Sequence, residues 1–196
     1  FAGRRIGAFT NREAVIRVER PELWTPETPK LYAFSAELGE DRVESYFALR
    51  DVGVGRDAEG RPCLLLNGKP VFQTGVLDQG YWPDGLYTAP SDEALIWDIQ
   101  TMKDLGFNLL RKHIKVEQMR WYYHCDRLGM LVWQDVPNGG GAYRMMTISA
   151  PLLTGRHRKD DDYRRFARTD AAGRAEYGQT LRELVGQLAN CPCIVQ

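Results

Sequence analysis

Short apolar runs alternate with longer segments of helical periodicity from Val71 to the end of the chain, and this alternation constrains the fold more than any other feature. Short strands that alternate with helices imply right-handed crossovers and a parallel sheet, covered on both faces because the runs are apolar throughout. A doubly wound sheet and a (β/α) barrel both satisfy this pattern. The sequence predicts strands at Val71–Leu77, Phe107–Leu110, Met130–Trp133 and Ile194–Gln196, and helices at Asp92–Leu105, Glu117–Leu128 and Glu176–Leu188.

The first part of the chain instead has the short, alternating runs that are typical of a β-sandwich. Three strands are expected there, and two prolines three residues apart exclude a helix between the first two. Because a complete sandwich needs about seven strands, we expect residues 1–57 to be the carboxyl-terminal part of such a domain and residues 58–196 to form the strand–helix domain. The three predicted strands are Ala14–Val18, Leu31–Leu38 and Val43–Leu49.

Two further segments connect these regions or interrupt them. Asp51–Arg61 is rich in glycine and charge, which indicates a linker or a hairpin connection. Asn67-Gly68 predicts a two-residue turn, because both residues adopt the positive φ angles that such a turn needs. Residues 137–174, with the charge run Arg156–Arg165, are expected to form a surface excursion at the mouth of the sheet, or alternatively a disordered, solvated run.

Composition limits the classes of partner. The 26 basic and 26 acidic side chains cancel, so nucleic acid and anionic membrane surfaces are not expected partners. No apolar stretch approaches the length of about 18 residues that a membrane span requires. The beginning of the chain lacks the apolar core of a signal peptide, although the location of the protein, cytoplasmic or exported, stays open. The four cysteines are interpreted as incidental thiols, since Cys191-x-Cys193 is too tightly spaced for a usual disulfide or zinc site.

Four patches in the same order resemble glycoside hydrolase family 2, the group of β-galactosidases, β-glucuronidases and β-mannosidases. The resemblance spans Trp24 to Gln196 and implies a partial immunoglobulin-like sandwich followed by a partial (β/α)8 TIM barrel, from its first strand to the start of its fourth. The third patch tracks the first signature of the family with matching spacing, and the fourth resembles the opening of its second signature. The patches are Trp24–Tyr32, Leu66–Val76, Gly106–Val132 and Asn190–Val195.

This resemblance implies an exo-acting, retaining β-glycosidase, whose substrate would be an oligosaccharide or another glycoside. Retaining hydrolysis uses two carboxyl groups about 5 Å apart, which in the family are glutamates after the fourth and seventh strands. We expect both beyond Gln196 and assign no catalytic residue to this chain, which alone is expected to be inactive. The alternative is a carbohydrate-binding or scaffold protein on the same fold. Assembly into homo-oligomers stays open.

Candidate sugar-binding residues follow the predicted strands, because barrel sites gather at the carboxyl ends of strands. After the first strand, Asp78, Gln79 and Trp82 are suited to bind hydroxyl groups and to stack on a sugar ring, unless they belong to an ordinary loop. At the third strand, Trp133 and Asp135 are candidates, with a packed ring and a helix cap as the alternatives.

The candidates at the second strand are cationic. The resemblance matches Arg111 to the arginine that orients the catalytic glutamates of the family, and a salt bridge to a helix is the alternative. His113 and Lys115 follow it, but the histidine is displaced by one position from the more common Ser-His-Tyr-Pro of the family. Where magnesium-binding β-galactosidases carry a glutamate, this sequence has Gly139, so we expect no metal and no cofactor.

Overall fold

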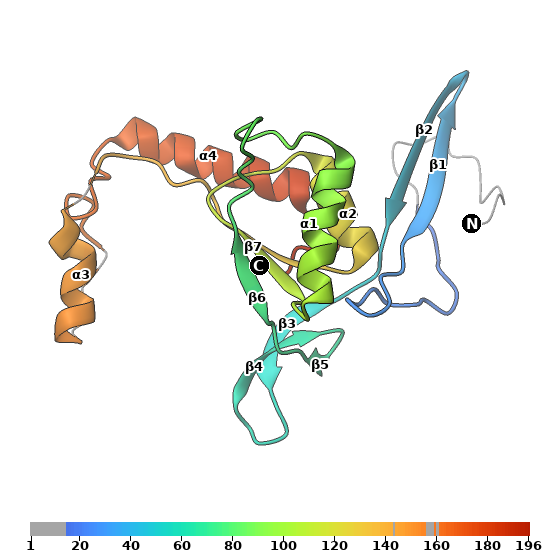
Figure 1. The fold of residues 1–196 in the computed structure, drawn as a ribbon, viewed down its shortest axis with the longest axis horizontal. Coiled ribbons are helices and arrows are strands. Elements are labelled where there is room, and N and C mark those ends of the chain that lie inside the picture. The colour runs from blue at the N-terminus through green and yellow to red at the C-terminus, as the bar shows by residue number, and fades with distance from the viewer. Residues whose placement is uncertain (1–14, 143, 156–158, 160) are drawn as a thin grey trace. The chain divides into compact units, whose positions relative to one another are not determined.

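The computed structural model describes residues 15–142, 144–155, 159 and 161–196 (Figure 1). It divides into two compact units, the first formed by the chain up to Asp135 together with Ala189–Gln196, and the second by Val136–Leu188. The first unit holds a hairpin, a small antiparallel sheet and a parallel sheet with two helices, whereas the second holds two helices.

The predicted second and third strands of the sandwich region are confirmed as β1 (Tyr32–Leu38) and β2 (Asp41–Phe47), which pair antiparallel from Tyr32↔Phe47 to Leu38↔Asp41. The rings of Tyr32 and Phe47 stack at the base of this hairpin, with their centroids 5.3 Å apart. The first predicted strand is wrong for residues 15–18, and Ala14 lies outside the described residues. Val15 is 96% exposed while Ile16 and Val18 are half-buried, but residues 15–18 adopt no strand conformation.

Of the two expectations for Asp51–Arg61, a linker or a hairpin connection, the structure shows the hairpin. β3 (Val52–Arg56) pairs antiparallel with β4 (Pro62–Leu66), and β5 (Lys69–Pro70) completes this small sheet. A Cβ atom at Gly55 would lie 2.6 Å from Cδ1 of Leu65, so the glycine leaves room for the Leu65 side chain. The Asn67-Gly68 turn is confirmed, with φ angles of 52° and 74°. The predicted domain boundary at 57/58 falls inside the β3–β4 hairpin and stays a prediction.

The strand–helix alternation is confirmed. β6 (Gly75–Asp78), β7 (Leu109–Lys112) and β8 (Leu131–Gln134) form a parallel sheet in this order. The start of a fourth strand appears as a parallel bridge from Ile194 to Val132. β6 begins later than predicted, because the backbone N–H of Val71 donates to Leu64 of the β4 hairpin.

Helices α1 (Asp92–Asp104) and α2 (Met119–Leu128) lie side by side next to the parallel sheet (Figure 1). The hydroxyl group of Ser91 caps α1 by accepting from the N–H of Ala94, and Gly129 ends α2 in the left-handed conformation. The core lies between the helices and the sheet, and β6 is less covered than expected because Leu77 is 52% exposed. Core side chains with less than a tenth of their surface exposed include Leu95, Ile99, Leu110, Trp121, Tyr122, Cys125 and Val132.

Buried Asp126 on α2 ties the region before the sheet to the sheet itself. Its backbone carbonyl accepts from Nε1 of Trp24 at 2.7 Å, and its carboxylate accepts from the Tyr46 hydroxyl and the Cys193 N–H, each at 2.8 Å. Burial raises the pKa of this carboxyl group, while the bonds from Cys193 and Tyr46 act in the opposite direction. The hairpin and the sheet are therefore joined through one acid.

The second unit contains α3 (Met145–Thr154) and α4 (Ala171–Leu188). α4 is confirmed and begins earlier than predicted. The helix α3 was not predicted, because the glycines of 139–141 and the charge run beyond it indicated an irregular excursion. Residues 156–158 and 160 of that charge run lie outside the described residues. No helix in the described part of the chain combines the length and the apolar character needed to cross a membrane.

Candidate functional site at the carboxyl ends of β6, β7 and β8

The eight candidate residues divide between two faces of the sheet and the loops that follow it. Successive side chains of a strand point to opposite faces, and the register pairs Leu77 with Arg111 and Arg111 with Trp133. Arg111 and Trp133 therefore share one face, whereas Asp78 lies on the other face in register with Lys112 and Gln134.

On the first face, Arg111 and Asp135 form a two-pronged ion pair. Nε of Arg111 donates to Oδ1 and Nη2 donates to Oδ2, each at 3.0 Å, and these hydrogen bonds raise the pKa of the arginine. The partner of Arg111 thus follows the neighbouring strand and is not on a helix. The arginine side chain is 48% exposed, and among the described residues its Nη1 makes no hydrogen bond. A charged donor in a defined plane remains available to a second carboxylate or to a ligand.

Trp133 is also held in place on this face. Its Nε1 donates to Oε1 of Gln73 at 2.5 Å, so a residue that precedes β6 orients the ring. Gln73 was not among the predicted site residues. A long polar side chain inside the mainly apolar run Val71–Leu77 was the signal available for it.

On the opposite face, four charged side chains form what we call the ion cluster: Asp78, Lys112, Lys115 and Glu117. Nζ of Lys112 lies 2.8 Å from Asp78 and 3.1 Å from Glu117, and Nζ of Lys115 lies 2.7 Å from the same Glu117 oxygen. The Lys112 side chain is 1% exposed and its Nζ stands 4.1 Å from the centre of the Trp121 ring. Two cations and two anions cancel, which is what permits burial of such a group.

Lys112 and Glu117 were also missed by sequence reasoning. A lysine at the end of an apolar strand, followed five residues later by an acid, was the signal available. Asp78 and Lys115, which were predicted as sugar ligands, have their charged groups in this cluster. Their predicted contacts with sugar remain predictions.

The remaining candidates lie on the loop that follows β6 and on its neighbour. Nδ1 of His113 lies 3.1 Å from Oε1 of Gln79, and the His113 N–H donates to the carbonyl of Asp78. Trp82 forms an isolated bridge with Leu86, and its Nε1 is buried without a hydrogen-bond partner in the described part of the chain. Gln79 and His113 thus meet, while Trp82 is tied to its own loop.

Gln134 links helix α2 to the segment that follows β7. The Tyr122 hydroxyl donates to its Oε1 at 2.6 Å, and its Nε2 donates to the carbonyl of Lys115 at 2.8 Å. Burial raises the pKa of Tyr122, so this hydroxyl stays a donor at neutral pH. Neither residue was predicted as part of the site.

In the described part of the chain, no group of three or more His, Cys, Asp or Glu side chains is placed to hold a metal ion. All four cysteines are free, and Cys125, Cys191 and Cys193 are buried. Burial raises the pKa of Cys191 to about 12, which leaves its thiol protonated at neutral pH.

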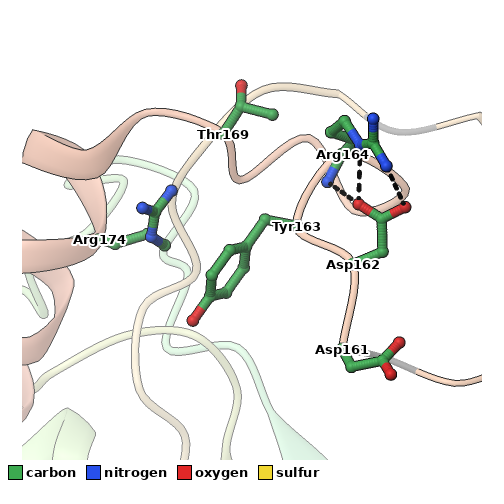
Figure 2. Close-up of a pocket in the computed structure, with 6 residues that line it drawn as sticks. All are labelled: Asp161, Asp162, Tyr163, Arg164, Thr169 and Arg174. Atoms are coloured by element: carbon green, nitrogen blue, oxygen red, sulfur yellow. Dashed lines mark hydrogen bonds and ion pairs between the residues drawn. The ribbon is translucent and has the colours of Figure 1, made fainter.

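The second unit has an open hollow of its own, of about 550 Å³, which contains none of the eight candidates. Figure 2 shows Arg164 beside Asp162, where its Nε lies 3.1 Å from Oδ1. The guanidinium carbon of Arg174 lies 4.3 Å from the centre of the Tyr163 ring. Asp162 and Arg164 pair with each other, and the Arg174 guanidinium donates to the carbonyl of Arg168, so these groups are engaged within the second unit.

Comparison with known families supports the two-part architecture. Residues 3–50 match the family model described as glycosyl hydrolases family 2, and residues 60–195 match the one described as glycosyl hydrolases family 2, TIM barrel domain. Of the two arrangements that the strand–helix alternation allowed, the barrel is therefore confirmed. The residues that the structure describes hold only some of the strands and helices of such a barrel.

Similar proteins are several times longer than this chain. A β-galactosidase of Lactococcus lactis is 33% identical over 132 residues, and one of Yersinia pestis is 34% identical over 128 residues. These alignments cover 66% and 64% of this chain but only 13% and 12% of the two relatives. Among solved structures, a β-D-glucuronidase of Dictyoglomus thermophilum shares the fold, with a TM-score of 0.68 and 20% identity over 90% of this chain and 28% of its own.

Proposed function

Because this chain belongs to glycoside hydrolase family 2, we propose that the whole protein hydrolyses O-glycosidic bonds as an exo-acting, retaining β-glycosidase. The chain covers 12–13% of the length of the two β-galactosidases described above, so the proposal concerns the protein that contains residues 1–196. Within it, these residues contribute the part of the sugar pocket at the carboxyl ends of β6, β7 and β8.

The ion pair between Arg111 and Asp135 carries this proposal. Both oxygens of Asp135 accept from the guanidinium group and fix its orientation. Nη1 of Arg111 is thereby left as a directed, permanently charged donor. Such a donor suits the positioning of a carboxylate that must stand within a narrow range of a sugar ring. We assign Arg111 the role of orienting a catalytic carboxylate and Asp135 the role of holding Arg111.

The catalytic carboxyl groups are proposed to come from elsewhere in the protein. Retaining hydrolysis needs one carboxyl group that protonates the leaving oxygen and a second that attacks the anomeric carbon. Asp135 is held by Arg111, and Asp78 by Lys112, so neither aspartate is free to take either role. We propose that both groups are glutamates outside residues 1–196, after the fourth and seventh strands of the barrel.

The proposed substrate is a neutral β-glycoside, in keeping with the two relatives named β-galactosidase. The lysines nearest to the site are neutralised within the ion cluster, so they offer little charge to an acidic sugar. Trp133 is proposed to stack on the ring of the bound sugar, and Gln79 with His113 to bind hydroxyl groups.

The test is an assay of the whole protein against a panel of nitrophenyl β-glycosides, together with an Arg111→Ala variant. We expect turnover of at least one substrate and a loss of about 10²-fold in kcat/KM in the variant, because a carboxylate loses its alignment. Arg61→Ala is the matched control, since Arg61 also pairs with an aspartate, Asp57, at an exposed position. Sugar binding without turnover would support the non-catalytic alternative, and a variant as active as the parent would remove the role given to Arg111.

A further inference from the structure

Two tyrosine rings stand exposed on the loop that follows β6. Tyr81 is 59% exposed and Tyr87 is 63% exposed, and the two rings meet edge to face with their centroids 5.1 Å apart. We call them the tyrosine pair. Aromatic rings normally contribute to a core, and two of them held together in solvent form a ready apolar surface.

The loop that carries the tyrosine pair is fixed by its own backbone. Trp82 and Leu86 exchange two backbone hydrogen bonds, of 2.7 and 3.0 Å. The N–H of Gly80 donates to Oδ1 of Asp78 at 2.8 Å, and the N–H of Thr88 donates to the carbonyl of Gly85 at 2.9 Å. The rings are thus presented by a defined turn.

Lys115 fastens this loop to the segment after β7. Its Nζ donates to the carbonyl of Gly80 at 2.6 Å and to the carbonyl of Tyr87 at 2.8 Å, and it also pairs with Glu117. The two carbonyls flank the tyrosine pair, so one ammonium group sets the distance between the ends of the loop. The same Nζ lies 5.4 Å from the centre of the Tyr87 ring. Because the loop is already fixed, the binding of a ligand costs less conformational entropy of the loop.

We propose that the tyrosine pair is the surface that receives the leaving group of the glycoside, and that Lys115 positions it. This proposal rests on the proposed hydrolysis. The loop begins at the carboxyl end of β6, the edge where Arg111 and Asp135 stand on the neighbouring strands, so it borders the sugar pocket. The occupant is a neutral ring, either the C–H face of a second sugar or an aryl group, because the ammonium group of Lys115 is already neutralised by Glu117.

The experiment compares leaving groups in the whole protein. For the sugar that the parent protein turns over, kcat/KM is measured for its nitrophenyl glycoside, for a disaccharide that ends in it, and for its glycosyl fluoride. We expect the double variant Tyr81→Ala/Tyr87→Ala to lose about tenfold in kcat/KM on the first two substrates. The fluoride should be hydrolysed as before, since fluoride is too small to reach the rings.

Matched variants separate binding from folding. Tyr177→Ala removes an exposed ring from α4 and should change none of the three values. Lys115→Met should lower kcat/KM on the nitrophenyl glycoside and on the disaccharide by a larger factor than on the fluoride, and Lys115→Arg should restore part of this loss. An equal loss on the fluoride, or no loss on any substrate, would overturn the proposal, and a loss confined to the nitrophenyl glycoside or to the disaccharide would identify which ring is received.

Failure of the proposed function would be visible separately. If the parent protein turns over none of the substrates, hydrolysis is contradicted. The surface is then tested by the binding of nitrophenyl β-galactoside, measured through the quenching of tryptophan fluorescence. Weaker binding by the double tyrosine variant than by Tyr177→Ala would keep the surface as a ring-binding site, whereas equal binding would remove it.

Discussion

Arg111 and Lys112 are neighbours in the sequence, yet the strand directs them into opposite environments. The side chain of Arg111 is half exposed and its guanidinium group pairs with a single aspartate. The ammonium group of Lys112 is instead enclosed by two acids and an indole ring. An exposed pair costs little to break, while a buried charge deprived of its partners is expensive. The comparison indicates that Arg111 keeps part of its guanidinium group open to solvent, whereas Lys112 holds the end of the sheet together.

The largest expected effect is that of Lys112→Ala, which leaves Asp78 and Glu117 close together and without their shared cation. We expect the free energy of unfolding of the whole protein to fall by about 3–5 kcal/mol. Arg111→Ala should change the stability little and the activity strongly. Urea unfolding followed by tryptophan fluorescence, alongside the glycosidase assay, measures both. If Lys112→Ala proves as stable as Arg111→Ala, the contrast between the two faces is wrong.

A smaller effect is expected from Gly80→Ala, which inserts a methyl group into the ion cluster. The added Cβ would lie 2.3 Å from Oε1 of Glu117 and 2.9 Å from Nζ of Lys115, and Gly80 has a positive φ of 60°. Overpacking of this kind costs about 1–3 kcal/mol. Gly60→Ala is the control, since Gly60 also has a positive φ but has nothing within 4 Å of the added atom. Equal loss of stability in both variants would mean that backbone strain, and not the cluster, sets the cost.

The smallest expected effect is a pH dependence that comes from Asp126, a buried acid whose hydrogen bonds come from uncharged donors. Its folded pKa is raised by burial above the ordinary value of 3.8, so the folded state binds the proton more tightly than the unfolded state does. Stability should therefore fall as the pH rises from about 3.8 through the raised pKa. Asp126→Asn should flatten this part of the curve of unfolding free energy against pH. An unchanged slope would contradict the effect of burial at this position.

Local sequence patterns predicted most of the fold. The apolar period of 92–105, the cap at Ser91 and the glycine at 129 place α1 and α2, because these signals act within one or two turns of a helix. Predictions failed where a local pattern had a different tertiary outcome. Asp51–Arg61 was compatible with a linker or with a hairpin connection, and only its pairing with β4 shows the hairpin, whereas residues 15–18 alternate but form no strand.

The candidate site was predicted in part, for a similar reason. The positions of polar residues after apolar strands selected Arg111, Asp135, Gln79 and His113, and the structure brings these together in two pairs. The strands looked apolar on both sides, so the sequence did not show which face the helices cover. Lys112 and Glu117 were consequently missed, and the enclosure of Asp78 among charges was not foreseen.

By itself, the sequence determined the strand–helix alternation of the parallel sheet, the Asn67-Gly68 turn and the family. These depend on residues close together in the chain or on patches in a fixed order. Only the tertiary structure decided that Arg111 meets Asp135, 24 residues away, and that Lys115 fastens the loop of the tyrosine pair. Such contacts depend on the register of parallel strands that are separated by whole helices, and no local signal carries that register.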